Sequence, residues 1–301
     1  MKCIICDSEC ESKLKSRDNF ITGDYGFNVW NCTNCKLLFL NPMPSEKELA
    51  KYYPQDKYYS LKGETSEIKK LFLKIYRSII DLAIPSQKED WKAGQKVVDL
   101  GSGSGEYLIK LKEKGIEAVG VEPYNFDEEY AKKMGLTIYK NSLNKTNFPD
   151  KSFDGIRMSH VFEHISNPEE VLNESKRILK DDGKIIISTP NSNSWAFRWF
   201  KKNWYALDSP RHVYLYSPEN LELLAKKNGL KVEKVFFESG AINYSASIYY
   251  SIINGLGLKW TLLTANLPLK IITPLFIPLA WVSNVMKKGD YMKVILVKKS
   301  A

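Results

Sequence analysis

The sequence has little histidine or cysteine, and it begins without an apolar run. Of its 301 residues, three are histidine and five are cysteine. The first residues, Met1-Lys2-Cys3, lead directly into the cysteines, where a secretory signal would place an apolar segment. We therefore expect a cytoplasmic protein, in which thiols stay reduced and disulfides do not form.

The chain also lacks internal repeats and low-complexity tracts. Its hydrophobic content of 44% can fill the core of one α/β domain with appendages. The formal net charge of +9 would suit an anionic partner. Because the lysines are scattered, a solvated basic surface explains this charge equally well. Composition is therefore consistent with one α/β domain with appendages, and it does not identify a binding partner.

Four of the five cysteines form two Cys-x-x-Cys pairs near the N-terminus. Two such knuckles can present four thiolates to one tetrahedral zinc ion, and four protein ligands leave no open position for chemistry. The sequence predicts a ribbon over residues 1–40 that holds structural Zn²⁺, with Cys10 as a spare thiol. The expected ligands are Cys3, Cys6, Cys32 and Cys35.

Residues 41–92 are expected to form a linker with N-terminal helices. Prolines punctuate the start of this segment. Apolar residues then recur at helical spacing over 67–83, and Pro85 ends the pattern. We expect this helix to pack on the domain that occupies 93–301.

From residue 93 onward, predicted strands and helices alternate. This alternation favours an α/β fold with a doubly wound, Rossmann-like parallel sheet. The predicted strands are 96–100, 118–122, 136–139, 153–158, 184–188, 232–237 and 291–297. The predicted helices are 106–114, 126–134, 168–179 and 218–228.

The first of these strands runs into a glycine-rich turn with the pattern D-x-G-x-G-x-G, from Asp99 to Gly105. Glycines let the chain turn sharply and bring bare backbone amides against a ligand. The second strand ends at Glu122, and an acid about 20 residues after such a turn can bind both hydroxyls of a ribose. The two features together predict a site for a nucleotide-type cofactor.

This turn, with an acid before its first glycine, resembles motif I of the class I S-adenosylmethionine (SAM) methyltransferases. The segment 153–191 resembles the second half of the same superfamily. The resemblance implies that SAM is the cofactor, that the glycines contact its methionine and ribose, and that Glu122 binds the ribose hydroxyls. The implied cofactor-binding residues are Asp99, Gly101, Ser102, Gly103, Gly105, Glu122, Ser142 and Leu143, the last two beside the adenine.

The N-terminal features narrow the resemblance. Two cysteine pairs followed by Asn-Pro-Met-Pro and Tyr-Tyr look like zinc-ribbon methyltransferases of sugar and polysaccharide biosynthesis. This implies a sugar, a glycan or a lipid-linked glycan as the acceptor. In 210–217, His212 aligns with the base of related sugar C-methyltransferases, whereas Arg211 stands where they carry an acid, so the atom that is methylated stays open.

Two histidines are candidate catalytic residues. An imidazole with a pKa near 6.5 can accept a hydroxyl proton at neutral pH, and His212 is the predicted general base. His164 follows a core strand, and it either positions the substrate or packs against the sheet edge. Residues 160–164 match the zinc-protease motif H-x-x-E-H, but the position of this motif after a parallel strand disfavours a protease function.

An apolar insertion is expected over 240–288, before the last strand. It is too short and too interrupted for a span of about 20 residues, so we expect either a folded lid or peripheral contact with the cytoplasmic face of a membrane. Trp260, Trp281, Lys287 and Lys288 suit an interfacial anchor. With the segment 191–217, the insertion is expected to cover the active site.

Two alternative functions stay open. Ribosomal RNA base methylation combines four zinc ligands with a SAM fold in some enzymes, although the second cysteine pair and 162–164 fit it poorly, and nucleic acid is not the expected partner. The other alternative is a catalytically silent adaptor that binds zinc or a membrane. Failure to bind SAM would favour this adaptor.

Overall fold

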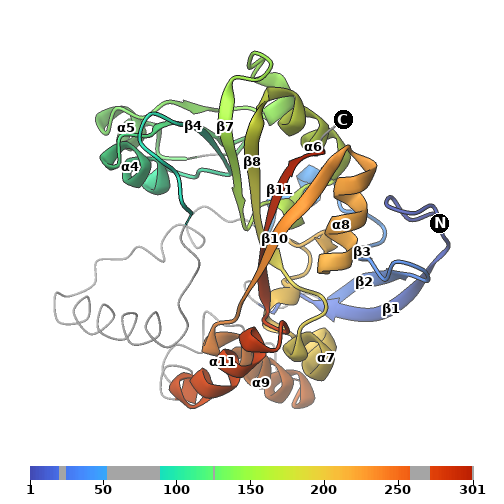
Figure 1. The fold of residues 1–301 in the computed structure, drawn as a ribbon. Helices are drawn as coiled ribbons and strands as arrows, with labels where there is room; N and C mark the ends of the chain where they lie inside the picture. The colour runs from blue at the N-terminus through green and yellow to red at the C-terminus, as the bar shows by residue number, and fades with distance from the viewer. Residues whose placement is uncertain (20–24, 53–88, 125, 258–271, 300–301) are drawn as a thin grey trace, which may run out of the picture. The chain divides into compact units, whose positions relative to one another are not determined.

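The chain divides into two units, each built from segments that are separate in the sequence (Figure 1). The computed structural model describes residues 1–19, 25–52, 89–124, 126–257 and 272–299. The first unit comprises the described residues of 1–87, 190–217 and 237–291, and the second comprises those of 88–189, 218–236 and 292–301. The expected helix over 67–83 and Trp260 lie outside the described residues. The expected domain boundaries near 40 and 92 stay predictions.

A seven-stranded sheet forms the second unit, with the strand order β10-β11-β8-β7-β4-β5-β6. The ladders that join β6, β5, β4, β7 and β8 are parallel, which confirms the predicted Rossmann-like α/β sheet. The strands are β4 (Lys96–Leu100), β5 (Glu117–Val121), β6 (Ile138–Tyr139), β7 (Phe153–Ser159), β8 (Leu179–Pro190), β10 (Leu230–Glu238) and β11 (Tyr291–Lys298).

Helices of the second unit connect these strands and bury one face each. α4 buries Leu108 and Leu111, which are three residues apart and so lie on the same side of the helix. Leu111 packs in a core cluster with Val97 of β4 and Ile186 of β8. Burial of each such side chain stabilises the fold by about 1.5–3 kcal/mol. The helices are α4 (Glu106–Glu113), α5 (Glu128–Lys133), α6 (Pro168–Ile178) and α8 (Pro218–Lys227), with the short 3₁₀ helices η2 (Leu143–Lys145) and η3 (Phe162–His164).

Two element boundaries differ from the prediction for local reasons. α5 begins two residues late because the Asp127 carboxylate accepts a hydrogen bond from the Tyr130 N–H at 2.9 Å and caps the helix there. α6 ends before Leu179, which is already extended and pairs with Phe153 of β7. β8 therefore starts five residues earlier than predicted, at 179 in place of 184.

A smaller, antiparallel sheet forms part of the first unit. Its order is β1-β2-β3-β9, with β1 (Cys10–Arg17), β2 (Tyr25–Cys32), β3 (Leu38–Leu40) and β9 (Tyr214–Leu215). The first three strands belong to the predicted ribbon. The fourth comes from the distant segment 191–217, and the Leu40 N–H donates to the Val213 carbonyl at 3.0 Å. The ribbon and this segment therefore share one sheet.

Helices complete the first unit around a buried carboxylate. Asp290 is inaccessible to solvent and accepts hydrogen bonds from the Trp204 indole at 2.8 Å and the Ser239 hydroxyl at 2.5 Å. Its backbone carbonyl accepts from the Asn191 N–H at 2.8 Å. These bonds join the 191–217 segment to Ser239 and Asp290, which flank the expected insertion. The helices are α1 (Glu46–Ala50), α7 (Trp195–Phe200), η4 (Lys201–Asn203), η5 (Tyr205–Leu207), α9 (Ala241–Gly255), η7 (Thr273–Phe276) and α11 (Ile277–Val285).

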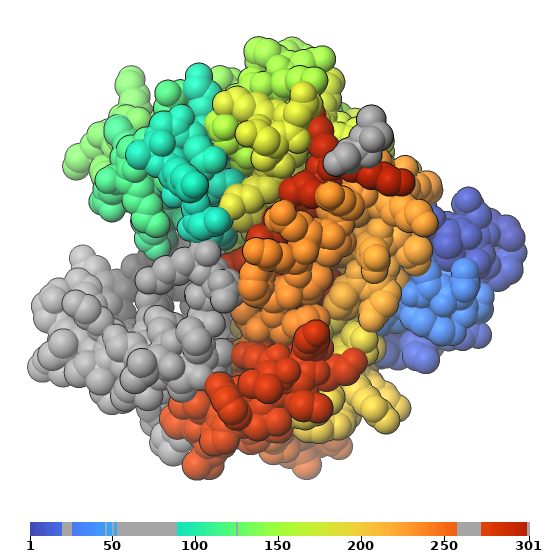
Figure 2. All heavy atoms as spheres, viewed as in Figure 1, coloured from blue at the N-terminus to red at the C-terminus, as the bar shows by residue number. Residues whose placement is uncertain are grey.

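The described part of the insertion exposes apolar side chains. On α11, Ala280 and Ser283 are buried, whereas Trp281 and Val285 are 53% and 59% exposed. The helix thus turns its small residues inward and its large apolar ones outward, and its atoms lie at the surface in Figure 2. Among the described residues, no helix is long and apolar enough to span a bilayer.

Candidate functional site

The glycine-rich turn joins β4 to α4 in left-handed backbone conformations. Gly101, Gly103 and Gly105 have φ values of 67°, 52° and 89°, which side chains rarely adopt. A Cβ on Gly105 would lie 2.5 Å from Leu136 Cδ1, whereas one on Gly103 would meet nothing within 4 Å. Gly105 is therefore required for packing, and Gly103 borders open space where a ligand can approach the backbone.

The Glu122 carboxylate lies against this turn, as predicted from the spacing of the two motifs. Its Oε2 accepts from the Gly103 N–H at 3.0 Å, and its Oε1 accepts from the Tyr124 N–H at 3.1 Å. The side chain is mostly buried and follows the carboxyl end of β5. A carboxylate has about four acceptor positions, so about two remain for other donors.

This arrangement fits the SAM cofactor implied by the sequence. A ribose has two adjacent hydroxyls that match the two remaining acceptor positions of Glu122. The open space beside Gly103 leaves room for the rest of the ligand next to bare backbone. The two residues expected beside the adenine do not form an evident binding surface. Ser142 is exposed at the start of η2, and Leu143 is buried in the core.

Asp99 faces a buried ion-pair network. Its Oδ1 accepts from Arg157 Nη1 at 2.8 Å, and Arg157 also lies 3.1 Å from Glu89 and over the Tyr107 ring. Burial raises the pKa of Asp99 to about 6, although Arg157 opposes the shift. Asp99 thus anchors the end of β4 to β7. Sequence reasoning missed Arg157, because only the strand register places it opposite Asp99.

Ser102 packs beneath the turn. A Cβ on Gly120 would lie 2.3 Å from Ser102 Oγ, so the serine fits only because β5 carries a glycine there. The hydroxyl is buried and has no hydrogen-bond partner among the described residues. Ser102 therefore packs the glycine-rich turn against Gly120 of β5.

His164 belongs to the second unit, in the 3₁₀ helix after β7. Its ring is half-buried, and its backbone N–H donates to the Val161 carbonyl at 2.9 Å. The preceding Glu163 is fully buried and accepts from the Thr189 hydroxyl at 3.0 Å. His160 Nδ1 lies 3.5 Å from the same carboxylate. Glu163 therefore ties the ends of β7 and β8 together beside both histidines.

His212 belongs to the first unit, directly before β9. Its Nδ1 lies 2.9 Å from the Ala206 carbonyl, an acceptor that selects the tautomer with the proton on Nδ1. Nε2 then carries the lone pair that a general base needs, and it lies 3.8 Å from Asp208 Oδ2. The ring is 11% exposed. Sequence reasoning missed Asp208, the acid beside this histidine.

Arg211 is a buried structural residue. Its guanidinium donates to Asp18 at 2.7 Å and to Asp208 at 2.5 Å, and the side chain has no exposed surface. Burial alone would lower the pKa of Arg211, but Asp208 and Asp18 raise it above its ordinary value. Arg211 therefore fixes Asp208 in place and links it to the end of β1, where Asp18 follows.

The four predicted zinc ligands converge at one end of the ribbon. Their sulfur atoms all lie within 4.8 Å of one another, with Cys3 to Cys35 at 3.6 Å and Cys6 to Cys32 at 3.5 Å. Zn–S bonds of about 2.3 Å at tetrahedral angles require sulfur separations of about 3.8 Å. The four cysteines form no disulfide, and this donor set fits a tetrahedral metal ion. Cys10 stands outside the group.

Comparison with known proteins identifies the family of the chain. The family described as methyltransferase domain matches residues 69–235. The ubiquinone biosynthesis O-methyltransferase of Actinobacillus pleuropneumoniae is 30% identical over 122 residues, which cover 37% of this chain and 52% of that protein. The demethylmenaquinone methyltransferase of Thermotoga maritima is 27% identical over 175 residues, covering 49% and 76%. The chain spans about half the length of the first of these relatives.

Among solved structures, a SAM-dependent methyltransferase from Archaeoglobus fulgidus has a TM-score of 0.47 and 24% identity, with 82% of this chain and all of that chain covered. The match to the family extends over more than half of the sequence and includes the glycine-rich turn and Glu122. The chain therefore belongs to the methyltransferase domain family, and it carries a class I SAM-dependent methyltransferase domain.

Proposed function

We propose that the protein transfers a methyl group from SAM to a sugar, a glycan or a lipid-linked glycan. The observation that carries the methyl-transfer part is the hydrogen bond from the Gly103 N–H to Glu122 at 3.0 Å, because it sets a carboxylate that can accept from ribose hydroxyls beside the glycine-rich turn, at the carboxyl ends of parallel strands. The acceptor class is supported by the four-cysteine ribbon, whose motifs resemble those of zinc-ribbon methyltransferases of sugar biosynthesis.

The chain's own residues have two tasks in this reaction. SAM, when bound, supplies a methyl group that is already activated on a sulfonium, so the protein mainly has to align the acceptor. For a hydroxyl acceptor it must also remove a proton. His212 is the proposed base, because the bond from Nδ1–H to the Ala206 carbonyl places the basic lone pair of the neutral ring on Nε2.

The exposed apolar face of α11 supports peripheral contact with a membrane. Trp281, Val282, Val285 and Met286 lie on one side of the helix and are all exposed, and Lys287 and Lys288 follow them. Aromatic, aliphatic and basic residues in this order suit the interface of an anionic bilayer. A lipid-linked acceptor could then be reached without leaving the membrane.

A second acceptor class is favoured by the names of the relatives. The relatives described above act in ubiquinone biosynthesis or on demethylmenaquinone. An acceptor of quinone biosynthesis is apolar and membrane-bound, so the exposed face of α11 suits it as well.

One labelling experiment separates these acceptors. Purified protein is incubated with SAM that carries a labelled methyl group and with a cell extract separated into sugar nucleotide, lipid-linked glycan, quinone and RNA fractions. The proposal expects label in one of the two sugar fractions, and a Glu122→Ala control at the same SAM concentration should reduce it. Label in the quinone or RNA fraction alone would show that the acceptor is a quinone precursor or RNA and not a sugar. If calorimetry detects no SAM binding, the result would support the catalytically silent adaptor.

A further inference from the structure

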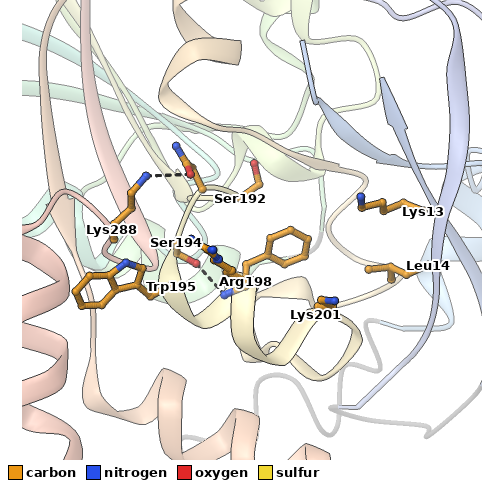
Figure 3. A pocket seen from close by; sticks show the side chains of 10 residues that line it. Lys13, Leu14, Ser192, Ser194, Trp195, Arg198, Lys201 and Lys288 are labelled. Carbon is orange, nitrogen blue, oxygen red and sulfur yellow. Dashed lines mark hydrogen bonds between the residues drawn. The ribbon is translucent and has the colours of Figure 1, made fainter. Parts of the chain in front are cut away.

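A pocket in the first unit brings four basic side chains together (Figure 3). Its volume is about 540 Å³, and among the described residues that line it none is acidic. The cations are Lys13, Arg198, Lys201 and Lys288. Pockets for small ligands commonly measure about 300–1,000 Å³, so this one has room for a small molecule.

The four cations come from four places in the chain. Lys13 lies on β1, Arg198 on α7, Lys201 directly after α7, and Lys288 after α11. In the described part of the chain, none of them has an ion pair with a carboxylate, and Lys288 donates to Asn193 Oδ1 at 3.0 Å. Like charges in one pocket repel each other, so an anion there would stabilise the arrangement.

Irregular backbone places two of these cations. The register of β1 against β2 shifts between Ser12 and Leu14, so Lys13 occupies a β-bulge, a feature that redirects a side chain. Lys201 has φ 47° and ψ −111°, which a residue with a side chain rarely adopts. Irregularities of this kind concentrate at functional sites.

We propose that this pocket binds a phosphate or diphosphate ester. A guanidinium and three ammonium groups match the charge of two linked phosphates, and the Arg198 fork can donate two parallel hydrogen bonds to one of them. Trp195 lines the same pocket and stacks on Trp199 with ring centroids 5.8 Å apart. Its ring offers a flat apolar surface to whatever group carries the phosphate.

The ester could be a soluble nucleotide or the phosphate of a lipid. Lys288 lies three residues after the end of α11, so the pocket adjoins the helix whose apolar face is exposed. The pocket would also bind the phosphate of a phosphate-bearing acceptor. Only this connection to the acceptor rests on the proposed function.

Pyrophosphate binding to the full-length protein tests the site. Calorimetry should show binding that weakens with salt. The double variant Lys13→Gln with Arg198→Gln should weaken it at least about tenfold, a change of about 1.4 kcal/mol. The matched control is Lys15→Gln with Lys202→Gln, which removes the same charge from exposed neighbours outside the pocket and should change affinity by less than about threefold. Equal losses in both double variants, or no binding at millimolar pyrophosphate, would overturn the proposal.

A labelling measurement on the unmodified protein avoids any effect of the variants on folding. Pyrophosphate should protect Lys13, Lys201 and Lys288 from acetylation and leave Lys15 and Lys202 reactive. Equal reactivity with and without pyrophosphate would contradict the site.

Two further ligands identify the source of the phosphate. ADP that binds more tightly than pyrophosphate, and loses affinity in the pocket variant, indicates a soluble ester. Vesicles of phosphatidylcholine with phosphatidic acid that bind the protein but not the pocket variant indicate a lipid. Pyrophosphate binding without methylation of any phosphate-bearing acceptor would sever the link to the proposed function and leave the anion site intact.

Discussion

The Trp204 indole donates a 2.8 Å hydrogen bond to Asp290, a buried carboxylate that lies two residues after the expected insertion. Burial raises the pKa of Asp290 to about 6, although hydrogen bonds from Ser239, Trp204 and Ser194 oppose the shift. An unfolded aspartate has a pKa of about 3.9, so the folded state binds more protons between about pH 4 and 6. The free energy of unfolding that Asp290 contributes should therefore fall as the pH rises through this window.

Asp290→Asn should remove this dependence. From pH 4 to pH 7, the stability of the variant relative to the unmodified protein should rise by up to about 3 kcal/mol, because each pKa unit corresponds to about 1.4 kcal/mol. Chemical denaturation at several pH values measures the free energy of unfolding of both proteins. The titration of all other groups cancels in the difference between them. Asp182→Asn, which makes the same substitution at an exposed site, is the matched control. Parallel curves for Asp290→Asn and the unmodified protein would show that Asp290 is not the titrating group.

Glu122→Ala should weaken SAM binding by roughly 10- to 100-fold, because a hydrogen bond to a charged group contributes about 1.5–3 kcal/mol. Calorimetry measures the affinity directly. Glu128→Ala removes a carboxylate from the same unit, one that forms an exposed ion pair with Lys140, and should leave the affinity unchanged. Unchanged affinity in Glu122→Ala would remove Glu122 from the ribose site.

Metal analysis should find one zinc ion per chain. Cys32→Ser should lose it, because the remaining three sulfurs cannot complete a tetrahedron of thiolates. Cys10→Ser should keep it, since Cys10 lies outside the group of four. Full zinc content in the first variant, or loss in the second, would contradict the assignment.

His212→Ala should slow methyl transfer by about 100-fold or more, with SAM affinity nearly unchanged. His212→Asn is the informative partner, because its amide can still donate to the Ala206 carbonyl but has no basic nitrogen. Both variants should be slow if His212 removes a proton. Recovery of the rate in His212→Asn would instead make the histidine a positioning residue.

Membrane contact should depend on α11. Flotation with anionic vesicles should recover the unmodified protein and weaken in high salt, because Lys287 and Lys288 contribute attraction. Trp281→Ala and Val285→Ser should each reduce it, since both remove exposed apolar surface. Leu223→Ser, at a comparably exposed leucine of α8, should have no effect. If no vesicle recovers the protein, the insertion has no membrane role.

The sheet could be predicted because its signals are local. Runs of buried β-branched residues alternate with helical spacing, and the structure reproduces each predicted strand from β4 to β11 with shifts at the ends. The contact between Gly103 and Glu122 could also be predicted from the sequence, since parallel strands bring their carboxyl ends to one edge of the sheet. Capping by Asp127 and the early start of β8 depend on hydrogen bonds that periodicity does not encode.

The first unit was harder to predict because its contacts join distant segments. β9 has two residues, too few for a periodic signal, yet it extends the ribbon sheet. Asp208 lies near His212 through the fold of a loop, and Arg211 is buried although arginine is usually exposed. The basic pocket collects side chains from four segments, and only the mixture of aromatic and basic residues over 195–204 hinted at it.

If the ribbon holds zinc and His212 is the base, the pairing of β3 with β9 would couple metal supply to catalysis. Four thiolates hold one end of the ribbon, and the same sheet fixes the backbone just after His212. Zinc binding energy would then stabilise the position of the proposed base as well as the ribbon itself. A cell short of zinc would retain the cofactor fold but lose the ordered base, so the ribbon would act as a zinc-dependent control on the rate of methylation.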